Sequence, residues 1–180
     1  DELREIVTRA DETLKRVADK IEENSRRMEE IVREHERKVR ELLKRIEKLV
    51  RDLSAMVRRG ELDEESLKRL KDEIEKLLEE AERHSRDVKR KLDESNKRLE
   101  DDSRRHEEDL DRLVTEVEKR GVEGEEDLRR VVKRVKETNR RLLEKNKDSS
   151  RKLKKRLDEA NKTLADALEE VKRRIDERRK

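Results

Sequence analysis

The sequence predicts an all-α fold, an antiparallel up-down-up three-helix bundle of the coiled-coil type. Apolar residues recur every three or four positions from one end of the chain to the other. Proline is absent, and the three glycines mark two breaks in this pattern. A content of 58% charged and 28% hydrophobic residues would also fit a disordered chain, but the sustained helical periodicity favours long amphipathic helices.

We expect the helices over about residues 1–59, 63–120 and 124–180. In each of them the apolar stripe advances mostly by alternating steps of three and four residues, which is the spacing of a coiled-coil seam. In the first helix the stripe includes Ile31, and two successive steps of four meet at His35. This double step relaxes the heptad locally and predicts a weakly supercoiled bundle.

Two similar turns join the three helices. Gly60 and Gly121 each follow the end of a helical stripe, where a left-handed backbone conformation favours glycine. Asp63 is a good N-cap for the second helix, and Gly124 is a permitted one for the third. Turns this short make each helix run back along the preceding one, so residues 1–180 are expected to form a single domain.

The net charge of +3 is unevenly distributed along the chain. Residues 1–59, 60–124 and 125–180 carry net charges of +2, −7 and +8. An acidic middle helix suits a bundle in which that helix contacts both of its more basic neighbours. The basic run from Arg151 to Arg156 could instead bind nucleic acid or an acidic membrane surface, but acidic residues flank it and no aromatic residue accompanies it. We therefore expect a solvated face, with no nucleic-acid partner and no membrane partner.

The missing residue types also exclude functions: Phe, Trp, Tyr, Pro, Cys and Gln are all absent. Without Cys there is no disulfide, no thiolate nucleophile and no zinc–thiolate site. Without aromatic residues there is no stacking platform for single-stranded nucleic acid and few anchors for a protein partner. No apolar run approaches the ~20 residues of a membrane span, and the first residues do not resemble a signal peptide. We expect a soluble protein that is cytoplasmic on recombinant expression.

Polar residues interrupt the apolar stripes at positions that correspond between helices. A polar side chain in a core costs free energy unless it is hydrogen-bonded, so matched polar positions encode how the helices dock. With these turns, residues of the first and second helices lie level when their numbers sum to about 123, and those of the second and third when they sum to about 245. The candidates for a structural polar network are Asn24, His35, His84, Ser85, Ser95, Asn96, Ser103, His106, Thr138, Asn139, Asn146, Ser150 and Asn161.

Level matching sorts these candidates into three groups. Amides and imidazoles both donate and accept hydrogen bonds, and small hydroxyls rotate to complete the pattern. A slipped register would leave several buried polar atoms without partners, at about 1–3 kcal/mol each, so the groups would act as a specificity device. The groups are centred on Asn24 with Asn146, on His35 with His84 and Asn161, and on His106 with Asn139.

Catalytic and metal-binding roles fit the same residues less well. His35 and His84 could share a metal ion, but two imidazoles fall short of the three or four protein ligands of a zinc site. Ser85 or Ser103 beside a histidine could act as a nucleophile, but both lie in mid-helix without a Gly-rich oxyanion loop. We therefore expect no enzyme activity, no metal and no cofactor.

Three histidines at core positions raise the hypothesis of a pH response. Burial disfavours the charged imidazolium and so lowers the pKa of the ring. The folded state would then lose stability as the pH falls below about 6.5, the ordinary pKa of histidine.

Together these features resemble the class of computationally designed three-helix bundles that carry buried hydrogen-bond networks. The resemblance covers the whole chain and rests on the missing residue types, the two equivalent turns, the matched helix lengths and surface pairs such as Glu34 and Lys38. It implies a monomeric structural scaffold with no natural activity, no natural location and no required partner. Two alternatives stay open: a designed binding or assembly component that exchanges a helix or pairs with another chain, and a natural spectrin-like spacer, whose helices usually carry Trp, Phe and Gln.

Overall fold

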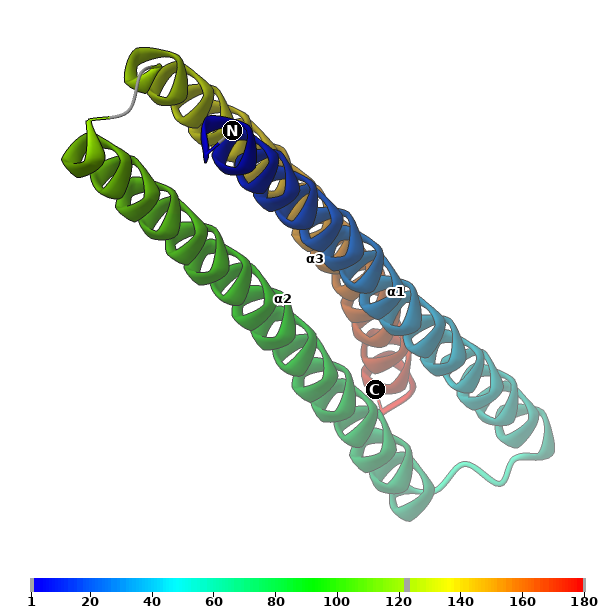
Figure 1. Ribbon diagram of the computed structural model, residues 1–180. Helices are drawn as coiled ribbons and strands as arrows, with labels where there is room; N and C mark the ends of the chain where they lie inside the picture. Colours follow the sequence, from blue (N-terminus) through cyan, green and yellow to red (C-terminus); the bar gives the residue numbers. More distant parts are fainter. Residues whose placement is uncertain (1, 122–123, 180) are drawn as a thin grey trace. The chain divides into compact units, whose positions relative to one another are not determined.

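The computed structural model describes residues 2–121 and 124–179. Over these residues the chain forms three helices joined by two short turns (Figure 1): α1 (Glu2–Arg59), α2 (Glu64–Arg120) and α3 (Glu125–Arg179). The all-α class and the three-helix arrangement expected from the periodicity are thus confirmed. Asp1 and Lys180, the outer limits of the expected helices, lie outside the described residues.

The end of α1 is a Schellman motif. The N–H of Gly60 donates to the carbonyl of Val57 at 3.3 Å, and the N–H of Glu61 donates to the carbonyl of Met56 at 3.1 Å. Gly60 has a φ of 68°, and Gly121 takes the same left-handed conformation after α2, with a φ of 60°. The backbone conformation therefore favours glycine at both positions, as their place after the apolar stripes predicts.

Asp63 and Gly124 precede α2 and α3 as N-cap residues, so each helix begins one residue later than the range expected from the sequence. The carboxylate of Asp63 accepts a hydrogen bond from the N–H of Ser66 at 2.8 Å. Hydrogen bonds from Ser66 lower the pKa of Asp63, and its negative charge suits the positive end of the helix dipole. Gly124, with a φ of 92°, has no side chain to cap with, and its carbonyl accepts the N–H of Leu128 at 3.0 Å.

The helices contribute to two compact units, each of which draws on all three of them. Unit 1 comprises Asp1–Met28 and Lys91–Lys152, and contains the turn between α2 and α3. Unit 2 comprises Glu29–Arg90 and Leu153–Lys180, and contains the turn between α1 and α2.

Each unit has its own apolar core, built from the helical stripes. In unit 1, buried side chains cluster around Leu110 and Leu128 and around Val17 and Leu99. Unit 2 contains a larger cluster. Burial of this apolar surface supplies the main favourable free energy of folding. The buried residues of the unit 2 cluster are Val39, Leu42, Ile46, Leu49, Leu53, Leu67, Leu70, Ile74, Leu77, Ala81, Leu164, Leu168, Val171 and Ile175.

The seam of α1 differs from the sequence prediction at its centre. Val32 is fully buried, whereas the neighbouring Ile31 is only partly buried. The two successive steps of four residues therefore meet at Met28, from Asn24 to Val32, and not at His35. Two adjacent branched apolar residues are equivalent in a periodicity argument, and only packing against the facing helices decides which of them enters the core.

Replacing Gly60 by alanine tests the requirement for a left-handed residue after α1. An added Cβ would meet no heavy atom within 4 Å, so any cost comes from the backbone conformation. We expect Gly60→Ala to lower the free energy of unfolding by about 1 kcal/mol, because a Cβ is strained at positive φ. Urea unfolding followed by circular dichroism measures this change. Gly60→Asn is the matched control and should cost less, since Asn tolerates this conformation; equal costs for the two variants would contradict the explanation.

Candidate functional site

The first buried polar network lies in unit 1 and forms one continuous chain of hydrogen bonds. The hydroxyl of Ser95 donates to Oδ1 of Asn24. Nδ2 of Asn24 donates to Oδ1 of Asn146 at 3.2 Å, and Nδ2 of Asn146 donates to Oδ1 of Asn96 at 3.0 Å. Nδ2 of Asn96 then donates to the hydroxyl oxygen of Ser150 at 2.8 Å. All the donors point the same way, so each amide uses both its nitrogen and its oxygen.

These five residues, named the amide network below, come from all three helices. Asn24 belongs to α1, Ser95 and Asn96 to α2, and Asn146 and Ser150 to α3. The two central amides are deeply buried, with exposed fractions of 7% for Asn24 and 3% for Asn146. Because buried amides lose free energy without partners, a shift of any one helix along the others is penalised.

The second network, named the imidazole network, lies in unit 2. Nδ1 of His35 lies 2.7 Å from Nδ1 of His84, and Nε2 of His35 lies 2.8 Å from Oδ1 of Asn161. Nδ2 of Asn161 donates to the hydroxyl oxygen of Ser85 at 2.6 Å. Since a carbonyl oxygen only accepts, Nε2 of His35 carries the proton. In a neutral ring Nδ1 of His35 is then the acceptor, and Nδ1–H of His84 is the donor.

The two networks connect the helices in the same order. Each begins on α2, crosses to α1, continues to α3 and returns to the next residue of α2. The α2 residues are the neighbours His84 and Ser85 in one network and Ser95 and Asn96 in the other. Adjacent side chains on a helix point about 100° apart, so one faces α1 while the next faces α3. Two neighbouring polar residues on α2 therefore suffice to join all three helices.

Burial has an electrostatic consequence for the imidazole network. His35 is fully enclosed, and desolvation lowers its pKa. The hydrogen bond to Asn161 opposes this effect, and the neighbouring ring of His84 adds to it. The neutral form of His35 is therefore favoured in the folded state.

The third group expected from the sequence is not joined by hydrogen bonds. Asn139 is fully buried, yet neither its Nδ2 nor its Oδ1 has a hydrogen-bond partner among the described residues. Thr138 donates instead to the carbonyl of Arg134 in its own helix at 2.9 Å. The hydroxyl that was expected to complete the group is thus bound within its own helix.

His106, the α2 member of that third group, and Ser103, a further candidate on α2, also lie apart from both networks. Ser103 is buried and His106 is partly buried, and within residues 2–121 and 124–179 neither side chain makes a hydrogen bond. Desolvation lowers the pKa of His106, and the nearby charge of Lys20 lowers it further. The level of a residue along its helix was therefore insufficient to predict this group, because two side chains at the same level need not point toward each other.

Sequence reasoning missed one cluster, in which Arg156 of α3 contacts α1 within unit 2. Its Nη1 donates to Glu29 at 2.7 Å and its Nη2 donates to Glu36. The hydrogen bond from Arg156 lowers the pKa of Glu29. The sequence held a usable signal, because α1 and α3 residues lie level when their numbers differ by about 122, the difference between the two level sums.

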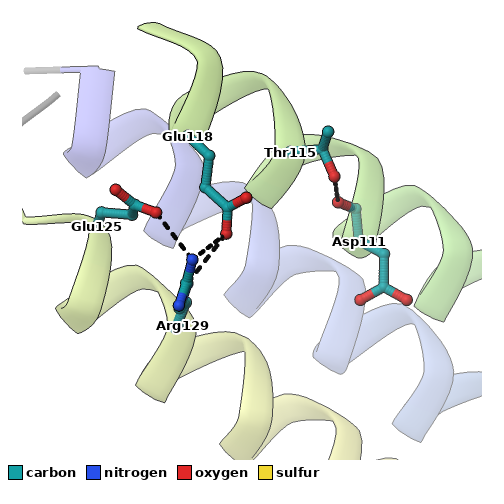
Figure 2. A network of polar contacts seen from close by, with 5 residues as sticks. All are labelled: Asp111, Thr115, Glu118, Glu125 and Arg129. Carbon is teal, nitrogen blue, oxygen red and sulfur yellow. Dashed lines mark hydrogen bonds and ion pairs between the residues drawn. The ribbon is translucent and has the colours of Figure 1, made fainter. Parts of the chain in front are cut away.

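Ion pairs in unit 1 agree with an acidic α2 that contacts more basic neighbours. Figure 2 shows Arg129 of α3 beside two carboxylates, with its Nε 3.0 Å from Glu118 of α2 and its Nη2 2.9 Å from Glu125. Further along α2, the side chain of Asp111 pairs with Lys136, and its carbonyl accepts the hydroxyl of Thr115 at 3.0 Å (Figure 2). Arg129 and Asp111 are exposed, so solvent screens these ion pairs and each adds little to stability.

In the part of the chain that the structure describes, no three His, Cys, Asp or Glu side chains are grouped to hold a metal ion. None of the described helices is both long enough and apolar enough to cross a membrane.

Comparisons with known proteins bear on the fold. No family model matches the sequence, and no curated protein matches it significantly. Among solved structures, a chain described as a "Computationally designed three helix bundle" matches with a TM-score of 0.70 at 19% identity, over 98% of this chain and 88% of that chain. In fold, this chain is similar to a designed three-helix bundle. The buried hydrogen bonds between polar side chains are observed in the present chain itself.

Two asparagines of α3 provide a matched test of what the partners contribute. Asn146 and Asn139 lie one heptad apart and are both buried, but only Asn146 is hydrogen-bonded. We expect Asn146→Leu to lower the free energy of unfolding by about 1–3 kcal/mol for each partner left unsatisfied, on Asn24 and on Asn96. Asn139→Leu should be neutral or stabilising, because it removes an amide that lacks partners.

Urea unfolding of the two leucine variants beside the parent chain measures both changes. Equal destabilisation by the two substitutions would show that the hydrogen bonds of Asn146 add nothing to the free-energy cost of replacing asparagine by leucine at these two positions.

Proposed function

We propose that this chain is a designed structural scaffold with no natural biochemical activity, in which two buried polar networks specify how the helices pair. The observation that carries the proposal is that each network takes residues from all three helices, in the same order. The fold of a designed three-helix bundle supports it. The absence of six residue types fits a sequence chosen from a restricted set.

Apolar seams alone cannot fix a unique register. If α2 moved by one heptad, Leu78 or Leu92 would take the position of Ser85, and the apolar stripe would still face the core. Asn161 would then lose its partner, and each polar atom left unsatisfied would cost about 1–3 kcal/mol. A cost of this size separates the correct register from its alternatives, as a single buried Asn does in a coiled coil.

We also propose that residues 1–180 act as one non-enzymatic, monomeric domain that requires no partner. No large hydrophobic side chain of the described residues is exposed, and obligate protein partners usually need such a surface. Charges in the basic run are partly neutralised, since Arg156 contacts Glu29 and Arg151 lies 3.3 Å from Asp148. This supports a solvated face over a nucleic-acid surface.

A variant with both networks replaced by apolar residues tests the proposed function. Its asparagines and histidines become leucine, and its serines become alanine. We expect the variant to stay helical by circular dichroism but to lose its single state, giving mixed oligomers in light scattering and multiple sets of backbone NMR signals. Apolar burial remains, whereas the penalty against alternative registers is gone.

The third polar group provides the control, since it lacks the hydrogen bonds of the networks. Replacing Ser103, His106, Thr138 and Asn139 by apolar residues should leave one monomeric species with one set of backbone NMR signals. A network-free variant that is equally monomeric and uniform would overturn the proposal.

A further inference from the structure

We propose that His35 and His84 form a two-step proton switch in unit 2: the pair takes up one proton with the imidazole network intact and opens the network on taking up a second. This goes beyond the proposed function, because it concerns the chemistry of one histidine pair and holds whether or not the networks set the register. Its evidence is the geometry of the two rings, their unequal exposure and the acceptor that Asn161 supplies.

The contact between the two rings is an in-plane hydrogen bond. Their planes differ by only 8°, their centroids are 5.0 Å apart and the two Nδ1 atoms are 2.7 Å apart. Rings stacked face to face cannot bring two nitrogens this close, because van der Waals contact keeps their planes further apart. The rings therefore meet edge to edge, with one Nδ1–H pointing at the lone pair of the other Nδ1.

The hydrogen bond of Asn161 fixes which ring is the donor. Its Oδ1 requires a proton on Nε2 of His35, so the neutral His35 ring accepts at Nδ1. His84 must then carry its proton on Nδ1, which leaves Nε2 of His84 unprotonated. Asn161 is itself oriented by its donation to Ser85. One asparagine on α3 thus determines the tautomers of two histidines on α1 and α2.

A first proton can bind without breaking any of these bonds. Nε2 of His84 is the remaining basic ring nitrogen of the pair, and protonation there leaves the Nδ1–H donor in place. His84 is partly exposed, whereas His35 is fully buried, so the positive charge is better solvated on His84. The singly protonated pair keeps every hydrogen bond of the neutral one.

A second proton must break the contact. The remaining basic site is Nδ1 of His35, which is the acceptor of the bond from His84. Once both Nδ1 atoms carry protons, two donors and two cations face each other in a space that fits one hydrogen bond. Like charges at this separation repel strongly in a buried site, so α1 and α2 must separate locally.

Charged groups on all three helices surround the pair. Glu36 on α1 favours the protonated form of His35, and Lys89 on α2 disfavours it. On α3, Arg156 engages Glu36, and Asp158 pairs with Lys89 at 2.9 Å. The carboxylates of Glu36 and Asp158 thus cannot neutralise a doubly protonated histidine pair without breaking the ion pairs that they already make.

The direction of the pH effect follows from the pKa of His35. Desolvation lowers this pKa in the folded state, so the unfolded chain binds more protons as the pH falls below about 6.5. Stability supplied by the neutral His35 is therefore present above that pH and is lost as the pH falls towards the folded-state pKa. The amide network contains no group that titrates in this range, so the two networks differ in this respect.

Nitrogen-15 NMR of the histidine rings in the whole chain tests the switch. At pH 8 we expect His35 as the Nε2–H tautomer and His84 as the Nδ1–H tautomer. On acidification the pair should take up one proton with scalar coupling between the two Nδ1 atoms retained, and that coupling should vanish in a second, separate step. His84 as the Nε2–H tautomer at pH 8, or simultaneous protonation of both rings, would overturn the proposal.

Hydrogen exchange locates the opening. Protection factors of amides near His35 and His84 should be unchanged through the first step and should fall through the second, because the second proton binds only when the contact between the rings is open. His106→Asn is the matched control and should leave this response unchanged. A loss of protection that accompanies the first step, or that disappears in His106→Asn, would contradict the proposed mechanism.

Asn161→Leu tests the origin of the tautomers. Without the acceptor for Nε2 of His35, the Nδ1–H population of His84 should fall, whereas Asn139→Leu in unit 1 should leave it unchanged. An unchanged His84 tautomer in Asn161→Leu would show that Asn161 does not set it. If Asn161→Leu fails to fold, the ring spectra of the parent chain still decide between the outcomes.

Discussion

A buried amide or imidazole costs free energy unless it has a hydrogen-bond partner, and in our proposal the arrangement of the three helices depends on this requirement. Apolar stripes supply most of the stability, but leucine packs against leucine in more than one register. Asn24 and His35 do not have that freedom, because each bonds to residues of both other helices. We infer that these directional groups select one arrangement among those that the apolar stripes would accept.

The two networks solve the same problem with different chemistry. In the amide network every central side chain has a fixed donor and a fixed acceptor, so its pattern does not depend on pH. The imidazole network places a titratable contact at the equivalent position, between His84 of α2 and His35 of α1. Asn139 provides the contrast, since it is just as buried but lacks partners among the described residues. We therefore expect its burial to lower the stability of the fold without linking any helices.

Much of this arrangement could be predicted from the sequence, because it depends on periodicity and on glycine. Gly60 and Gly121 fixed the turns, and the turns fixed which residues lie level, including those of both networks. Periodicity could not separate Ile31 from Val32, since the choice depends on packing. Level matching also could not show that Asn139 would lack partners, because the direction of a side chain depends on its rotamer and on competing bonds within its own helix.

The most direct test of the central claim is a double-mutant cycle between Asn24 and Asn146, measured as free energies of unfolding. If the two amides act as one unit, the double leucine variant should be less destabilised than the two single variants together, with a coupling of about 1 kcal/mol or more. The cycle between Asn24 and Asn139 should be additive, because no hydrogen bond joins them. Additivity within about 0.5 kcal/mol for Asn24 and Asn146 would contradict the account.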